Sequence, residues 1–226
     1  MEYFKLLEEL RSLADEKYRS FHARLLDDPS IKLFGVRMPV MRKLAKKYKG
    51  ELEKLLQFPD EFYEVTLLKC LTLGLQPYDV YSAHLQEVLP LIDNWATCDC
   101  FDAPCIKKNR AAFLEIITNI RFSEHEFTSR YALVQLLKYY CEEEYLPVIF
   151  ESAEGCDHTK YYVSMAAAWL VAEVLVKFYA AGVAFIKKGT MPAVTHNRAI
   201  RKARESFRLT AEQKEELNAL KRRKGE

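Results

Sequence analysis

Apolar residues recur with a helical period from one end of this chain to the other, and no stretch alternates with the two-residue period of a β-strand. The 226 residues include only seven glycines and eight prolines, which leaves few turns for a fold made of many short strands. Helices of about 10–20 residues must therefore supply the core. We predict an all-α fold.

The spacing of the helical segments predicts how they are arranged. An amphipathic pair is completed about every 35–45 residues, which is the length scale of HEAT-type repeats, although no literal repeat occurs. Two segments open with the spacing of a capping box, Ser123 with Glu126 and Thr210 with Gln213. We predict a single domain, residues 1–226, in which HEAT-like antiparallel helix pairs stack as a solenoid. A compact orthogonal bundle is the alternative.

Targeting, membrane and metal signals are lacking in the sequence. The first twenty residues carry charges throughout and predict an amphipathic helix, not a signal peptide. The longest uncharged run, YYVSMAAAWLVA at 161–172, has twelve residues, whereas a bilayer span needs about 20. The six cysteines lack the spacing of a zinc site, so we expect reduced, buried thiols, no metal and no cofactor. We predict a monomer in the cytoplasm with no membrane association.

The basic residues are concentrated in two segments, although the formal net charge is only +2. In VMRKLAKKYK, the residues Met41, Leu44, Ala45 and Tyr48 form one apolar helix face. The other faces carry bases with no acid between them, whereas ordinary surface helices mix the two signs. A solvated face is the alternative to an anion-binding one. The basic residues of this segment are Arg42, Lys43, Lys46, Lys47 and Lys49, and Arg37 stands just before it. Of these, Arg37, Arg42, Lys43, Lys46 and Lys47 are the candidate DNA-binding residues.

The second basic segment, THNRAIRKARESFR, repeats this pattern near the other end of the chain. Its apolar positions Ala199, Ile200, Ala203 and Phe207 are expected to share one face. Its basic residues are Arg198, Arg201, Lys202, Arg204 and Arg208, of which the first four are the candidate DNA-binding residues. Two such helices on a curved solenoid would hold the phosphates on both sides of a duplex. We therefore predict a concave basic cleft and double-stranded DNA as the partner.

A few polar and aromatic residues stand out from the apolar stripes. In LPLIDNWATCDCF, a single helix would place Leu91, Ile92, Trp95 and Asp99 on one face, so that an apolar stripe ends in a carboxylate. Arg130 lies at the edge of the stripe of residues 123–141, and Trp169 lies among alanines in the most apolar segment. From the residues alone, core packing of the tryptophans, a capping Asp99 and a surface-paired Arg130 stay open.

Several ordered motifs resemble those of the AlkD-like DNA alkylation repair proteins, which are DNA glycosylases built from HEAT-like helical repeats. The motifs are FGVRMPVMRKLAK, LIDNWATCD, SRYALVQLL, YYVSMAAAWLVAE and VTHNRAIRKARES, and they span nearly the whole chain. In that family, an aspartate four residues after a tryptophan, a later arginine and a second tryptophan line the catalytic cleft. By motif position, these residues are Trp95, Asp99, Arg130 and Trp169.

The resemblance implies a monofunctional DNA glycosylase, a hydrolase that releases cationic N3- and N7-alkylpurines without a metal and without flipping the base. Two departures reduce the polar and aromatic contacts expected near the cleft. Asn94 stands where relatives often have a further tryptophan, and Ser164, Met165 and Ala172 replace the Gln-Lys and Arg of active relatives. The alternatives are a non-catalytic binder of damaged, branched or single-stranded DNA, and a protein-interaction scaffold.

Overall fold

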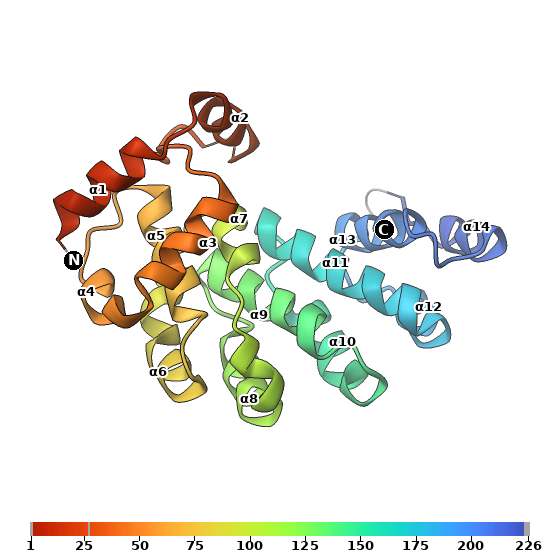
Figure 1. Cartoon of the computed structure of the whole chain (residues 1–226). Helices are drawn as coiled ribbons and strands as arrows, with labels where there is room; N and C mark the ends of the chain where they lie inside the picture. Colours follow the sequence, from red (N-terminus) through yellow and green to blue (C-terminus); the bar gives the residue numbers. More distant parts are fainter. Residues whose placement is uncertain (1, 27, 224–226) are drawn as a thin grey trace. The chain divides into compact units, whose positions relative to one another are not determined.

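The computed structural model describes residues 2–26 and 28–223, and every regular element in these ranges is a helix (Figure 1). The all-α prediction is therefore confirmed. The chain divides into two compact units, Met1–Arg110 and Ala111–Glu226. The prediction of one domain stays a prediction.

In the first unit, the helix α5 is the centre around which the others pack. All of its residues are buried, and α3, α4, α6 and α7 pack against it. The core joins Leu6 and Leu10 of α1 to Met41 of α3 and to Leu68 of α5. The helices of this unit are α1 Tyr3–Ser12, α2 Glu16–Leu26, α3 Met38–Lys47, η1 Lys49–Glu51, α4 Leu52–Leu56, α5 Tyr63–Leu73, α6 Tyr78–Val88, η2 Leu89–Leu91, α7 Trp95–Cys100 and η3 Pro104–Lys108.

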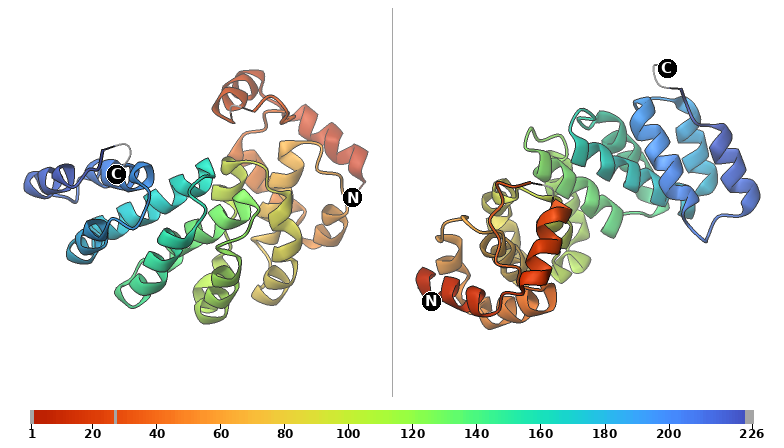
Figure 2. Two further views of the ribbon diagram at one scale, coloured as in Figure 1. Left: turned by 180° about the vertical axis from the view of Figure 1, so that it is seen from behind. Right: turned by 90° about the horizontal axis from the view of Figure 1, so that it is seen from above.

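In the second unit, α11 has the same central role. It packs against α9 and α13 on either side and against α10 and α12 behind, so alternate helices form two layers (Figures 1 and 2). Such contact between alternate helices is consistent with the predicted solenoid of helix pairs. The helices here are α8 Arg110–Ile120, which starts at the last residue of the first unit, α9 Glu126–Tyr139, η4 Glu143–Tyr145, α10 Leu146–Gly155, α11 Tyr161–Lys177, α12 Tyr179–Lys188, α13 Ala193–Arg204 and α14 Ala211–Ala219.

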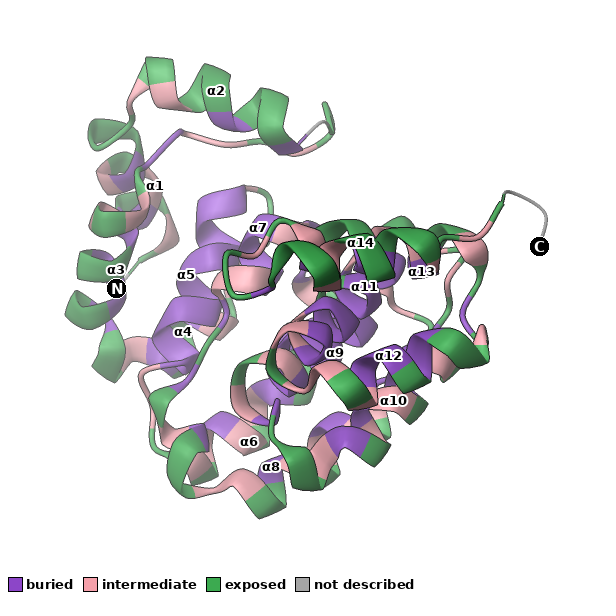
Figure 3. Cartoon of the chain, turned by 90° about the vertical axis from the view of Figure 1, so that its right-hand side faces the viewer, coloured by how far each residue is buried: buried purple, intermediate pink, exposed green. Residues whose placement is uncertain are grey.

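Burial follows the predicted apolar faces closely. The uncharged run 161–172 lies in the buried helix α11, and Met41, Leu44, Ala45 and Tyr48 are all buried (Figure 3). No helix in the described ranges is both long and apolar enough to cross a bilayer. Four of the cysteines are buried, and Cys100 and Cys105 are half-buried. Burial raises the pKa of the Cys156 thiol to about 12, which keeps it protonated.

Three local predictions are wrong, each because a helix begins or ends at another residue. α7 begins at Trp95, so Leu91 and Ile92 precede it and do not share its face. α13 ends at Arg204, which leaves the Phe207 side chain fully exposed instead of buried. His125, not Ser123, caps α9 by accepting a hydrogen bond from the backbone N–H of Thr128. The other predicted capping box, at the start of α14, is confirmed.

Candidate functional site

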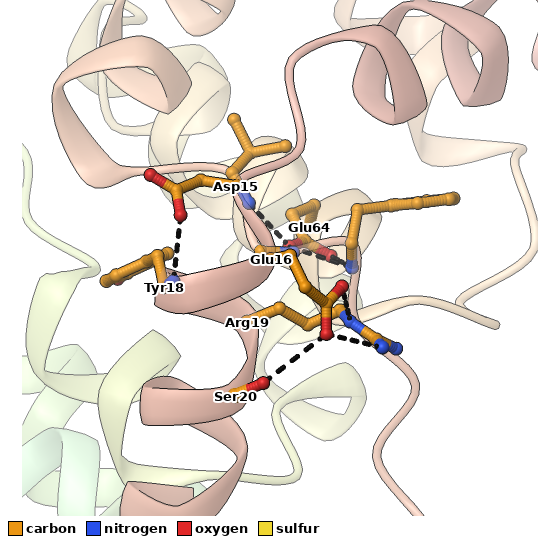
Figure 4. A network of polar contacts seen from close by, with 9 residues as sticks. Asp15, Glu16, Tyr18, Arg19, Ser20 and Glu64 are labelled. Atoms are coloured by element: carbon orange, nitrogen blue, oxygen red, sulfur yellow. Dashed lines mark hydrogen bonds and ion pairs between the residues drawn. The ribbon is translucent and has the colours of Figure 1, made fainter.

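A buried carboxylate fixes the loop that leads into the first basic helix (Figure 4). The Glu64 side chain is fully buried and accepts hydrogen bonds from the backbone N–H groups of Phe34, Gly35 and Val36, the shortest being 2.7 Å. Gly35 has a φ of +87°, and a Cβ there would lie 2.5 Å from the Cβ of Arg19. The loop therefore requires both the carboxylate and a glycine, and together they set where α3 begins.

We expect Glu64→Gln to destabilise the protein by about 1.5–3 kcal/mol, the usual contribution of hydrogen bonds to a charged group. The amide keeps the shape of the side chain but removes the charge that three N–H groups point toward. Urea-induced unfolding measures the loss. The control is Glu61→Gln, the same change at an exposed carboxylate, which should alter stability by less than about 0.5 kcal/mol. Equal stability of the two variants would show that Glu64 does not anchor the loop.

The structure divides the basic residues around α3 into paired and unpaired cations. Arg37 pairs with Asp15 at 2.8 Å, and Lys47 pairs with Glu9 at 2.6 Å. Both acids lie outside the basic segment in the sequence, so the absence of acids within that segment did not mean that its cations are unpaired. The remaining cations, Arg42, Lys43 and Lys46, are exposed and make no ion pair with a described residue.

The short helix α7 presents the predicted Trp95 and Asp99. Asn94 caps it, since its side chain accepts a hydrogen bond of 2.8 Å from the backbone N–H of Thr97. Asn94 itself is buried. The residue that replaces the tryptophan of the family pattern is therefore the N-cap of the helix that carries Trp95 and Asp99. Trp95 is half-buried against the core of the first unit.

Asp99 is half-buried in the last turn of α7, so it is not the N-cap that its spacing left open. A carboxylate near the C-terminal end of a helix gains nothing from the helix dipole. Neither N-capping nor the helix dipole therefore explains its position.

A cavity of about 230 Å³ in the first unit lies between the basic helix and the end of α7. Its lining includes Arg42 and Lys46 from α3, with Cys100 and Asp102 at and beyond the end of α7. A Cβ at Gly74 would lie 2.2 Å from the backbone oxygen of Asp102, so a glycine is needed for this close approach. The fold thus brings two unpaired cations to the residue that follows Asp99.

In the second unit, one cavity of about 500 Å³ gathers five of the six predicted site residues of that unit. It is lined by Arg130, Met165, Ala168, Trp169, Arg198, Arg201, Lys202 and Glu205. Trp169 is 37% exposed, so it is not simply a core residue. Glu205 is the one acid of this lining, and the hydrogen bond from Lys202 holds the pKa of its carboxyl below the usual range. The arginines and the lysine of this cavity can bind an anion, and the indole face of Trp169 can bind an aromatic or cationic group attached to that anion.

Arg130 is held with its guanidinium beside the start of α11. Its side chain is almost fully buried, and its Nη1 donates a 2.8 Å hydrogen bond to the backbone oxygen of Tyr162. The guanidinium also lies 5.9 Å from the centre of the Tyr162 ring. These contacts hold the Arg130 guanidinium at the wall of the cavity. Because the side chain is buried, Arg130 does not belong to an exposed surface ion pair, which was the alternative that the sequence left open.

Ser164 positions Arg198, a role that the sequence analysis missed. Its Oγ accepts a 2.9 Å hydrogen bond from Arg198 and lies 2.9 Å from the Oγ1 of Thr195. Thr195 in turn lies 3.0 Å from Nδ1 of His158, whose pKa is lowered by burial. The Arg198 guanidinium also stacks 5.0 Å from the ring of Tyr161. No local pattern links a serine in an apolar run to an arginine 34 residues later.

Arg204 is the predicted DNA-binding residue of α13 that does not line this cavity. Its guanidinium contacts α14 instead, through Asn218 at 3.0 Å and Glu215 at 3.5 Å. Of the predicted set, Arg130, Trp169, Arg198, Arg201 and Lys202 come together in the second unit. Trp95 and Asp99 belong to the first unit.

The fold and these cavities define an all-helical protein whose second unit packs its helices in two layers and contains a basic, tryptophan-containing cavity suited to an anionic ligand. The model of the DNA alkylation repair enzyme family matches residues 6–206, and the chain belongs to this family. The family assigns it a role in DNA alkylation repair, as an enzyme with DNA as its partner. Comparisons with curated proteins and with solved structures gave no match.

Proposed function

We propose that the protein is a monofunctional DNA glycosylase that hydrolyses the N-glycosidic bond of cationic N3- and N7-alkylpurines in double-stranded DNA. The observation that carries this proposal is the cavity of the second unit, in which a half-exposed Trp169 is surrounded by Arg130, Arg198, Arg201 and Lys202. Membership of the DNA alkylation repair enzyme family supports it. The monomeric state and the cytoplasmic location stay predictions.

The chemistry of the lesion explains why such residues suffice. An alkylated purine already carries a positive charge, so it can leave without a general acid. The barrier lies in the cation that develops on the deoxyribose. A fixed carboxylate at Asp99 would stabilise that cation and orient the attacking water, which is a preorganised electrostatic role.

The other residues of the set would hold the substrate in place. Trp95 and Trp169, each within its own unit, offer an indole face, and such a face attracts a cationic base or sugar. Arg130, fixed by the backbone of Tyr162, would hold a phosphate beside the lesion through charge-assisted hydrogen bonds. In this scheme the base need not leave the duplex, because no enclosed base pocket is required.

Base release tests the proposal directly. Duplexes that contain N7-methylguanine or N3-methyladenine are incubated with excess protein, and the free base is measured by mass spectrometry. We expect the alkylpurine to be released and the sugar–phosphate backbone to stay intact. Tight duplex binding without base release would instead favour the alternative, a non-catalytic binder of damaged, branched or single-stranded DNA. The apolar Met165 in the cavity lining, where the resemblance leads us to expect a lysine, is the observation that favours this alternative.

A further inference from the structure

Two polar residues of α13 hold the C-terminal segment of the chain in a defined place. Asn197 forms a pair of hydrogen bonds with the backbone of Arg222, accepting from its N–H at 3.0 Å and donating to its carbonyl at 2.7 Å. The buried His196 donates through Nε2 to the carbonyl of Leu220 at 2.8 Å. Burial lowers the pKa of His196, so its ring is neutral at neutral pH.

The side chain of Arg222 completes this attachment. Its Nη1 donates to the carbonyls of Gly189 and Met191, at 2.9 Å each. The groups that hold the segment, an imidazole, an amide and two backbone carbonyls, are all neutral. Sequence alone would assign such a charged chain end to solvent.

The attached segment forms one wall of a second basic cavity. This cavity of about 560 Å³ is lined by Ala193, Val194, Asn197, Arg198, Arg201 and Lys221. Three cations from two separate segments thus face one space, and no acid among the described residues lines it. Neither Arg201 nor Lys221 forms an ion pair with any residue in the described part of the chain. Like charges gathered in this way repel one another unless an anion lies between them.

We propose that this second cavity binds a phosphodiester group of a DNA strand, with Lys221 as a phosphate contact and with His196 and Asn197 as the residues that position it. The inference rests on the proposed function, because it extends the same DNA-binding surface. Arg198 and Arg201 line both this cavity and the one that contains Trp169, so the two cavities are adjacent. A strand can place successive phosphates in both, whereas a free anion or a mononucleotide would occupy only one.

The test is the salt dependence of binding to an unmodified duplex by the full-length protein. We expect Lys221→Gln to lower the slope of log affinity against log salt by about 0.9, the effect of one lost phosphate contact. Asn197→Ala should lower it by a similar amount although it removes no charge, because the segment is no longer held at the cavity. The control is Lys138→Gln, an equal charge change at an exposed residue near the end of α9, which should leave the slope unchanged.

The outcomes separate this inference from the proposed function. Base release by the wild type, with wild-type slopes in both Lys221→Gln and Asn197→Ala, would overturn the inference alone. Altered slopes without base release would support it within the non-catalytic alternative. A free nucleotide is the other possible source of the phosphate, and titration with deoxyadenosine monophosphate tests it. If the nucleotide binds as tightly as the duplex and Lys221→Gln abolishes that binding, the cavity is a site for a free nucleotide and the inference is wrong. Thermal melting shows whether Asn197→Ala is still folded. If it is unfolded, the salt dependence of Lys221→Gln alone tests the inference.

Discussion

Asp99→Asn is expected to slow the single-turnover release of N7-methylguanine by about 10²–10³-fold, the usual loss when one preorganised electrostatic contact is removed. The amide keeps the shape and the hydrogen-bonding capacity of the side chain but removes the charge that the developing sugar cation needs. Affinity for the duplex should hold steady or rise, because a negative charge near the phosphates has been removed. Thermal melting should change little, because asparagine has nearly the same size and can still form hydrogen bonds at this position.

The matched control for this variant is Asp93→Asn. Asp93 is exposed two residues before α7, and asparagine there can still accept the hydrogen bond that Asn94 donates to it. Its excision rate should equal that of the wild type. If Asp99→Asn excises at the wild-type rate, or if it melts well below the wild type, Asp99 has a structural role and is not the catalytic group.

Removal of four cations that make no ion pair with a described residue is expected to reduce the salt dependence of duplex binding strongly. Changing Arg42, Lys43, Lys46 and Arg201 to glutamine should lower the log–log slope by about 3.6, which is four phosphate contacts at about 0.9 each. The slope falls because each of these side chains would otherwise release a counterion from the DNA. The measurement is fluorescence anisotropy with a labelled duplex over a range of salt concentrations.

A second quadruple variant loses the same total charge at cations that the fold already pairs. Arg37, Lys47, Arg204 and Arg208 contact Asp15, Glu9, Glu215 and Glu173, respectively. Their replacement by glutamine should lower the slope by less than half as much, because a paired cation must give up its carboxylate before it binds a phosphate. Equal slopes in the two variants would show that net charge alone governs binding. A wild-type slope in the first variant would remove duplex DNA as the ligand of these surfaces.

Local features of the chain were enough to predict the fold class. Helical periodicity reports which residues lie on one side of a helix, and that information is contained within a few turns. The buried faces of α3 and α13, with Met41, Leu44, Ala199 and Ile200, therefore lie where the pattern predicts. Arg130 and Trp169 interrupt apolar stripes, and the fold brings both to one basic cavity.

The partners of the charged residues could be identified only from the tertiary structure. Glu9 and Asp15 pair with Lys47 and Arg37 across the fold, and the buried Glu64 accepts hydrogen bonds from a loop about 30 residues earlier. The positions where helices start and stop also depended on long-range packing, as at Phe207 beyond the end of α13.

The same reason accounts for the attachment of the C-terminal segment to His196 and Asn197. Those contacts join residues about 25 positions apart, and they form only because the packing of α13 and α14 returns the chain to that surface. A hydrogen bond between distant residues has no spacing in the sequence that predicts it. Amino-acid order therefore determined which helices form and which of their faces are apolar, whereas packing determined which charges stay available to bind an anion.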